Sequence, residues 1–305
     1  MSESKRPVAV AGATGQLGKL ILKDLRRRGA EVRALVRPGT DPDRLAPLRA
    51  AGADVREVNL HSSDDLVAAL DQCRCVVSTL SGLEDVIVEG QKRLLDAAVE
   101  AGVPRFIPSD FSIDFTRLPF GTNRNLDLRK NFRAYADAAD ISVTSVLNGM
   151  FTDLLLGDAP LILPRVRRVI YWGRKDQPLD FTSMQDTATY TAAAALDPDA
   201  PRWLRISGNT LTAEGLARAA SDAYGEAYQT QWVGTIGVLT ALIDATRIFV
   251  PAREEVFPPW QGMQYLRNMF SGRGKLVTMN NDRYPNIRWQ TVADVLRAGQ
   301  AHGGA

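Results

Sequence analysis

The chain has 305 residues, of which 45% are hydrophobic, so it can bury a sizeable core in one large or two modest domains. Lys and Arg number 37 against 35 Asp and Glu, and the net charge of +2 gives no reason to expect nucleic acid or a membrane as partner. Cys73 and Cys75 are too close for an ordinary disulfide and lack metal-site spacing, which fits a reducing cytoplasm. We therefore expect a cytoplasmic protein with a small-molecule partner, no bound metal, and a homodimer as the one assembly worth considering.

The first half of the chain alternates short β-branched runs with longer amphipathic stretches, a pattern typical of repeated βαβ units around a parallel sheet. Ser62 or Ser63 is expected to cap one of the helices. Strands are predicted at residues 7–11, 32–36, 54–58, 75–79, 105–108 and 142–146, and helices at 17–28, 43–51, 62–70, 86–101 and 126–139. The predicted fold class is α/β, a Rossmann-type doubly wound parallel sheet with a smaller C-terminal substrate-binding lobe.

This rhythm ends after Asn148. Residues 162–172 read as strand and turn, and a helix capped by Asp186 is expected further on. We therefore predict a nucleotide-binding domain over residues 1–148. Residues 149–305 should build mainly the substrate lobe, with some elements returning to the sheet.

The apolar stretch 233–250 is interrupted by charged and polar residues. The spacing of Val238, Leu239, Leu242 and Ile243 predicts an amphipathic helix buried against protein, and it does not suit a bilayer span.

The sharpest motif in the chain joins the first predicted strand to the first predicted helix. It reads Gly12-Ala13-Thr14-Gly15-Gln16-Leu17-Gly18. A Rossmann turn needs glycine for a tight bend, for close approach to the pyrophosphate, and where helix packs on strand, and Gly12, Gly15 and Gly18 supply these. Amides at the start of the helix would then point at the phosphates. The motif predicts a dinucleotide site; the alternative is a glycine-rich turn with a purely structural role.

The end of the second predicted strand sets the choice of cofactor. An acid there would bind the ribose 2′-hydroxyl, whereas Ala34-Leu35-Val36-Arg37 ends in a base. Arg37 can offer a planar fork to a 2′-phosphate, so NADP(H) is the predicted cofactor. The alternative is that Arg37 is one more solvated surface charge.

Several separated segments together resemble the NmrA-like and isoflavone reductase-like family of atypical short-chain dehydrogenases/reductases. They are the glycine turn, Arg37, Val77-Ser78-Thr79, Gln91, Arg105-Phe106-Ile107-Pro108-Ser109-Asp110-Phe111 and Asn148-Gly149-Met150-Phe151. The resemblance implies NADPH as cofactor and a cleft for an aromatic or phenylpropanoid-type substrate. It also implies that a further set of residues lies near the cofactor or along the cleft wall: Thr79, Ser81, Pro108, Ser109, Asn148, Met150 and Phe151.

Reductases of this family carry a lysine on the helix before the sixth strand, where it handles the proton that accompanies hydride transfer. The resemblance places Arg129 at that position. Arginine can orient an oxyanion but does not readily release a proton, so Arg129 is the candidate catalytic residue as an electrostatic clamp. Leu128, Phe132, Tyr135 and Ala139 are expected to mark the buried face of this helix, with Arg129 at its edge. Its neighbour Lys130 is expected to face water.

Polar residues are dense between positions 109 and 129, after the end of a predicted sheet strand, where such folds bind ligands. We assign substrate contacts to Asp110, Phe111 and Asn125 from this segment and to Phe151. An ordinary solvated loop is the alternative interpretation.

Tyr171 and Lys175 have the Tyr-x-x-x-Lys spacing with which many short-chain dehydrogenases pair a phenol with a lysine. The spacing brings the two side chains together only on a helix. Residues 168–171 read as a strand and Gly173 as a turn, so we predict that this pair is not catalytic.

Two functions remain open from the sequence. The first is an NADPH-dependent reductase that transfers a hydride to a small aromatic carbonyl or related electrophile. The second is a non-catalytic NADP(H)-binding sensor or regulator of the NmrA-like type, which the arginine at position 129 favours.

Overall fold

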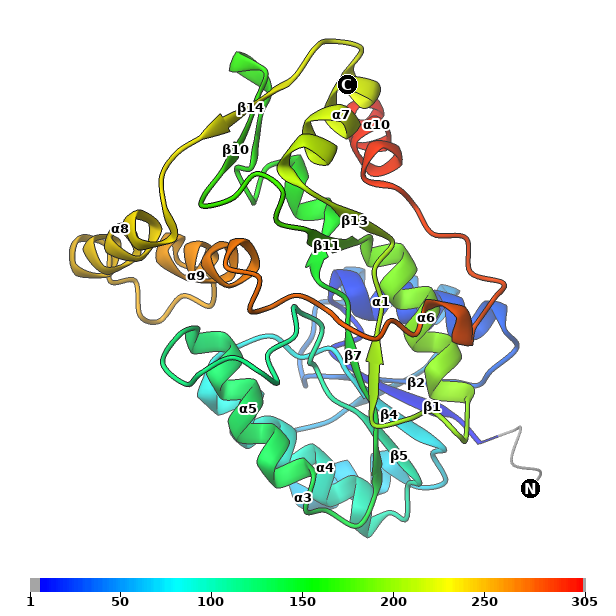
Figure 1. Cartoon of the computed structure of the whole chain (residues 1–305). Coiled ribbons are helices and arrows are strands. Elements are labelled where there is room, and N and C mark those ends of the chain that lie inside the picture. Colours follow the sequence, from blue (N-terminus) through cyan, green and yellow to red (C-terminus); the bar gives the residue numbers. More distant parts are fainter. Residues whose placement is uncertain (1–5, 304–305) are drawn as a thin grey trace. The chain divides into compact units, whose positions relative to one another are not determined.

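The computed structural model describes residues 6–303, and its contacts divide the chain into two compact units (Figure 1). Unit 1 comprises Met1–Asp110, Leu128–Val146 and Thr187–Leu204. Unit 2 comprises Phe111–Asp127, Leu147–Asp186 and Arg205–Ala305.

Unit 1 is built on a six-stranded sheet with the order β3-β2-β1-β4-β5-β6, in which every neighbouring pair is parallel. The strands are β1 (Val8–Ala11), β2 (Val32–Val36), β3 (Asp54–Glu57), β4 (Cys75–Ser78), β5 (Arg105–Ile107) and β6 (Ser142–Val143). Every residue of β1 and β4 is buried, as expected of central strands covered on both faces. The predicted Rossmann-type α/β fold is confirmed.

Helices separate these strands along the chain. They are α1 (Gln16–Arg27), α2 (Pro42–Ala50), α3 (Ser63–Leu70), α4 (Gln91–Glu100), α5 (Arg124–Ala136) and, at the far end of the unit, α6 (Met184–Leu196). Ser62 caps α3, because its hydroxyl accepts from the Asp65 amide at 3.3 Å. The expected helix over 86–101 is divided, since a π-helical stretch, Asp85–Gly90, precedes α4.

Unit 2 contains two three-stranded sheets, β14-β10-β9 and β13-β11-β8. Their strands are β8 (Met150–Phe151), β9 (Ile162–Leu163), β10 (Arg168–Tyr171), β11 (Leu179–Thr182), β13 (Asn209–Leu211) and β14 (Gln229–Trp232). Four helices accompany them: α7 (Ala213–Tyr224), α8 (Ile236–Phe249), α9 (Pro259–Phe270) and α10 (Val292–Gly303). No helix within residues 6–303 is long and apolar enough to cross a membrane.

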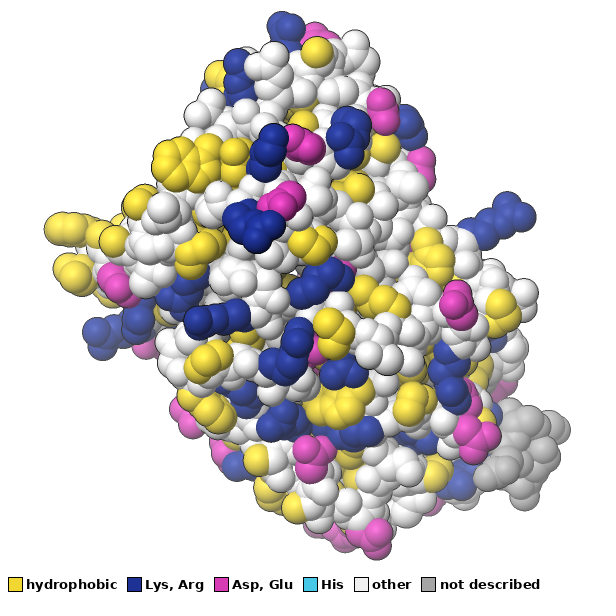
Figure 2. All heavy atoms as spheres, viewed as in Figure 1, with side chains coloured by type: hydrophobic (Ala, Val, Ile, Leu, Met, Phe, Trp, Pro, Cys, Tyr) yellow, Lys and Arg dark blue, Asp and Glu magenta, His cyan; other side chains and the backbone are white. Residues whose placement is uncertain are grey.

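The α8 helix is amphipathic, but its exposed face is less polar than predicted. Leu239 and Ile243 are buried, and the helix lies beside α9. Val238 and Leu242, which we expected on the buried face, are instead 52% and 45% exposed. Hydrophobic side chains gather at the left of the view in Figure 2, where Figure 1 places α8.

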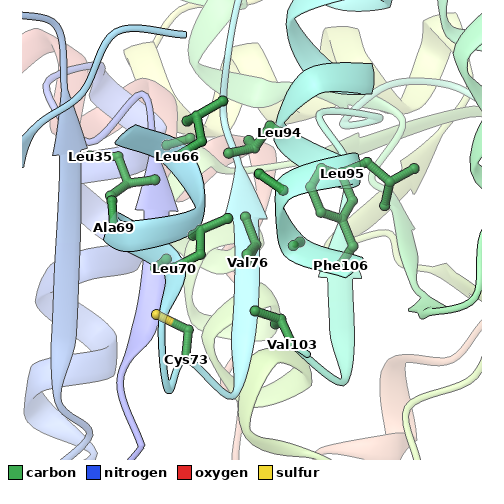
Figure 3. Close-up of a cluster of buried hydrophobic side chains, with 14 of the residues drawn as sticks. Leu35, Leu66, Ala69, Leu70, Cys73, Val76, Leu94, Leu95, Val103 and Phe106 are labelled. Atoms are coloured by element: carbon green, nitrogen blue, oxygen red, sulfur yellow. The ribbon is translucent and has the colours of Figure 1, made fainter. Parts of the chain in front are cut away.

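One hydrophobic cluster of unit 1 lies between the sheet and helices that include α3 and α4 (Figure 3). Leu66 and Leu70 of α3 and Leu94 of α4 point toward Val76 and Phe106 of the strands beneath them. This apolar layer holds the strand ends, and hence the loops that follow them, in fixed positions.

The predicted strand over residues 142–146 is in fact two. After β6 the chain leaves the parallel sheet, and β7 (Ser145–Leu147) pairs with β12 (Trp203–Arg205). The Thr144 amide still donates to the Phe106 carbonyl at 3.0 Å, but the Ser145 amide donates to the Arg202 carbonyl at 2.9 Å, so the chain changes partner between these two residues. Arg105 stabilises this point, since its guanidinium donates to the Thr144 hydroxyl at 2.5 Å and to the Ala200 carbonyl at 2.8 Å.

The helix expected to be capped by Asp186 begins earlier, at Met184. The Ser183 hydroxyl accepts from the Asp186 amide at 2.9 Å and so acts as the cap. The Asp186 carboxylate instead accepts from the Gln290 amide at 2.8 Å, and burial raises the pKa of this carboxyl. The predicted cap was therefore wrong by three residues.

Candidate functional site

A tight turn joins β1 to α1 at the carboxyl edge of the unit 1 sheet. The Gly15 amide donates to the Gly12 carbonyl at 2.9 Å, and Gly12 adopts a φ of +80°, which side chains disfavour. The Thr79 hydroxyl donates to the carbonyls of Ala11 and Gly12 at 2.9 and 3.1 Å. The end of β4 thus fixes the turn from the neighbouring strand.

Glycine is required at two positions of this turn for lack of space. A Cβ on Gly12 would lie 2.8 Å from the Thr79 Oγ1 atom. A Cβ on Gly18 would collide with the Gly12 carbonyl oxygen and lie 3.0 Å from the Cα of Ala13. These contacts are those expected where helix packs on strand in a dinucleotide-binding turn.

The first turn of α1 is left open to an anion. Its N-cap is Gly15, which brings no side-chain acceptor, and the turn contains no acidic residue. Gly15 and Gln16 are exposed, whereas Thr14 and Leu17 are half-buried. Amides without acceptors and the positive end of the helix dipole suit the pyrophosphate of a dinucleotide.

Two arginines lie on the elements that follow α1 in the chain, one directly after β2 and one in α2. Arg37, directly after β2, is exposed, and its guanidinium makes no hydrogen bond or ion pair within residues 6–303. Arg44 of α2 is also exposed and donates to the Thr14 hydroxyl at 3.3 Å. Arg44 was not predicted as a site residue, because only the folded chain brings α2 to the glycine turn.

Ser109, after β5, joins three elements of unit 1. Its amide donates to the side chain of Gln91 at 2.9 Å, and its hydroxyl donates to the Leu80 carbonyl at 2.8 Å. Its carbonyl accepts from Nε of Arg129 at 3.0 Å. The structure therefore brings Ser109 and Arg129 together, beside the buried Pro108; Ser81 is exposed on the loop after β4.

Asp110 is buried next to this junction. Its carboxylate accepts from the Ser145 hydroxyl at 2.6 Å, and Arg202 donates to the same hydroxyl at 2.7 Å. Burial raises the pKa of Asp110, while the Ser145 hydrogen bond and the charges of Arg129 and Arg202 oppose that rise. This environment makes Asp110 a fixed polar group of the unit interior, and its contact with a substrate stays a prediction.

The burial of α5 corrects the expected orientation of Lys130. This side chain is 4% exposed, whereas Tyr135, expected on the buried face, is 39% exposed and donates to Asp96 at 2.7 Å. Phe132 and Ala136 are buried as helical neighbours of Arg129, which is half-buried. The apolar pattern of α5 did not predict the burial of Lys130, because a lysine can bury its four-carbon stem.

Asn148 stands out among the site residues that fall in unit 2. It is fully buried. Its backbone N–H donates to the Ser112 carbonyl at 3.0 Å, and its backbone carbonyl accepts from the Thr182 hydroxyl at 2.7 Å. Its side-chain amide has no partner for Oδ1 or Nδ2 within residues 6–303. A buried amide without partners is costly, so these atoms mark a place for a polar ligand group or water.

Four further predicted residues also lie in unit 2. Met150 and Phe151 form β8, which pairs with β11, and Phe111 is buried. The Asn125 side chain donates to the Val256 carbonyl at 2.8 Å and accepts from Arg124 at 3.1 Å, so it holds the segment before α9.

Tyr171 and Lys175 do not share a helix. Tyr171 ends β10, Gly173 turns the chain with a φ of +68°, and the exposed Lys175 forms an ion pair with Glu214 at 2.8 Å. The prediction that their spacing falls outside a helix is confirmed.

The parallel sheet, its strand order and the glycine turn define a Rossmann-type α/β protein. The sequence of residues 4–258 matches the model of the NmrA-like family. The chain belongs to that family.

Known proteins agree with this assignment. The isoflavone reductase homolog IRL of Zea mays is 30% identical over 253 residues, which are 78% of this chain and 81% of that protein. A structure of AtPrR2 with NADP+ and (+)pinoresinol has a TM-score of 0.80 at 24% identity, covering 97% of this chain and 99% of that one. The leucoanthocyanidin reductase–NADPH complex of Vitis vinifera has a TM-score of 0.81 at 18% identity, covering 97% and 99%. At such identities the structures show a shared fold.

Proposed function

We propose that this chain is an NADPH-dependent reductase that transfers a hydride to a small aromatic or phenylpropanoid-like carbonyl or related electrophile. The observation that carries the proposal is the glycine turn, with its open helix N-terminus and, directly after β2, an exposed Arg37 that has no partner within residues 6–303. Relatives named as isoflavone and pinoresinol reductases support this reaction class.

In this proposal the first amides of α1, at Gln16, Leu17 and Gly18, receive the pyrophosphate. Arg37 pairs with the 2′-phosphate, and Arg44, tied to Thr14, adds a second positive charge. The nicotinamide, when bound, supplies the hydride. The remaining proposed cofactor contacts come from Gly12, Gly15, Thr79, Ser81, Pro108, Ser109, Asn148, Met150 and Phe151.

Arg129 is the proposed catalytic residue. Its Nε donates to the Ser109 carbonyl at 3.0 Å, which orients the planar guanidinium. A charge fixed in this way stabilises negative charge that develops on a substrate oxygen. We propose substrate contacts from Asp110, Phe111, Asn125 and Phe151. Residues 1–148 would then carry the cofactor, and residues 149–305 most of the substrate lobe.

The test is a turnover assay. The protein is incubated with NADPH and a panel of aryl carbonyls, flavonoids and lignans while loss of reduced-nicotinamide absorbance is followed. We expect at least one compound to be reduced in a protein-dependent manner, with NADH giving less activity. Absence of turnover across the panel, in protein that binds NADPH, would contradict the reductase proposal.

The second candidate is an NADP(H)-binding sensor without catalysis. Arg129 favours it, because the resembling reductases use a lysine there to handle a proton, and arginine holds its proton too tightly. The same assay separates the two candidates, since a sensor binds NADPH and reduces nothing.

A further inference from the structure

A cavity of about 550 Å³ lies within unit 2, and none of its lining residues is among those assigned above. Its walls come from the turn after β10, the start of α8, and the end of α9 with the residues that follow. This volume falls in the range of roughly 300–1,000 Å³ that is usual for small-molecule sites.

The cavity wall is positively charged. Arg174, Arg267 and Arg273 line it, and the described lining residues include no carboxylate. Arg174 is largely neutralised, because the exposed Asp176 carboxylate accepts from its Nε at 2.9 Å and from its Nη2 at 2.7 Å. The charge available to a ligand is therefore that of Arg267 and Arg273.

These two arginines differ in their surroundings. Arg267 is half-buried and donates to the Thr122 carbonyl. Burial lowers its pKa, as do the charges of Arg273 and Arg247, and only the charge of Asp244 opposes them. Arg273 is exposed, and within residues 6–303 its guanidinium has neither a hydrogen bond nor an ion pair. Two guanidinium groups that repel each other across a cavity would both gain from a bound anion.

Asn268 points to a ligand independently of these charges. It borders the cavity, it is 3% exposed, and its Nδ2 has no hydrogen-bond partner within the described residues. An unpaired buried amide donor is costly unless something outside the chain accepts from it.

An apolar wall faces the same space. Ile236 at the start of α8 and the buried Phe270 at the end of α9 line it. The Phe270 ring is held edge-on by Trp172, with ring centroids 5.7 Å apart. The cavity thus offers donors and positive charge beside a rigid hydrophobic surface.

We propose that this cavity binds a small organic anion. Its carboxylate or phosphate lies between Arg267, Arg273 and the Asn268 amide, and its apolar body lies against Ile236 and Phe270. The proposal does not rest on the reductase function, since every residue that carries it lies in unit 2 and none is assigned to the cofactor.

The test is calorimetric titration of the full chain, without cofactor, using cinnamate, its uncharged analogue cinnamamide, and inorganic phosphate. We expect cinnamate to bind at least tenfold more tightly than cinnamamide and also more tightly than inorganic phosphate. Equal binding of cinnamate and cinnamamide would overturn the anionic part of the proposal. Phosphate binding as tightly as cinnamate would overturn the role of the apolar wall.

Variants locate the site. Arg273→Ala removes an exposed side chain, so the fold should persist, and cinnamate affinity should fall at least tenfold. Arg288→Ala, an exposed arginine of unit 2 outside the cavity, is the matched control and should change nothing. Arg37→Ala should also leave cinnamate binding unchanged, whereas weakening by Arg37→Ala and not by Arg273→Ala would place the anion at the glycine turn and overturn the proposal.

Discussion

The glycine turn of unit 1 and the arginine cavity of unit 2 are two proposed anion sites built from different materials. The turn uses backbone amides, and it requires positions 12 and 18 to have no side chain. The cavity uses the guanidinium groups of Arg267 and Arg273 and the Asn268 side-chain amide, whose Nδ2 has no partner within residues 6–303. A site made of backbone amides should therefore lose ligand affinity when a Cβ is added at a glycine. A site made of side chains should lose ligand affinity when a charged side chain is removed.

The largest effect is expected from Gly18→Ala, which adds one carbon against the Gly12 carbonyl. Overpacking of this kind costs about 1–3 kcal/mol, so NADPH affinity should fall by roughly a hundredfold as the turn is pushed out of shape. Titration with NADPH measures it. Gly262→Ala in α9, where a Cβ meets nothing within 4 Å, is the control and should bind NADPH normally. Unchanged affinity in Gly18→Ala would show that the turn does not hold the cofactor.

Arg129→Ala should lower kcat by roughly two orders of magnitude once a substrate is known, as for the loss of one preorganised donor. Arg129→Lys should retain activity, because lysine also stabilises charge and can donate a proton. Steady-state kinetics with separate kcat and KM values provide the measurement.

Lys130→Ala is unsuitable as the control for this series because Lys130 is buried. Arg133→Ala is preferable: this side chain reaches Asp137 at 3.9 Å and is partly exposed. Arg133→Ala should leave kcat unchanged. A larger loss of kcat in Arg133→Ala than in Arg129→Ala would contradict the catalytic role proposed for Arg129.

Arg37→Ala should weaken NADPH binding about tenfold or more, because one charge-assisted hydrogen bond contributes roughly 1.5–3 kcal/mol. NADH binding should be unaffected, since NADH lacks the 2′-phosphate. Arg49→Ala, another exposed arginine of unit 1, is the comparison variant. Equal losses of NADPH affinity in the two variants would mean that Arg37 contributes only as one of many surface charges.

The smallest effect is expected from Tyr171→Phe. Tyr171 lies in a strand, and Lys175 is paired with Glu214, so no lysine activates the phenol. Turnover should be unchanged within experimental error. A fall of a hundredfold or more with the fold intact would mean that the chemistry runs through this tyrosine.

Local signals in the sequence predicted unit 1 well. The strands Val8–Ala11 and Val32–Val36 and the intervening helix Gln16–Arg27 match the predicted ranges to within a residue or two. The reason is that buried parallel strands are short continuous apolar runs, and the glycine turn between the first strand and its helix has a strict spacing. The cap of α3, expected at Ser62 or Ser63 and found at Ser62, likewise depends on neighbours in the chain.

Features set by distant residues were not predictable. The strand at 142–146 divides because Ser145 bonds to the distant Arg202 backbone and no longer to the parallel sheet, and no pattern near residue 145 indicates that. Arg44 reaches Thr14 only through folding of α2, and the burial of Lys130 contradicts a simple helical stripe. The arginine cavity was not predictable either, because its lining residues come from separate segments of the chain.

Unit 1 is proposed to be an NADP(H) site in which the exposed Arg37 selects the cofactor. Side-by-side titration of the wild-type chain with NADPH and NADH tests this most directly. We predict that NADPH binds at least tenfold more tightly, the ratio expected from a single charge-assisted contact to the 2′-phosphate of about 1.5 kcal/mol or more. Equal affinities for the two cofactors would contradict the account.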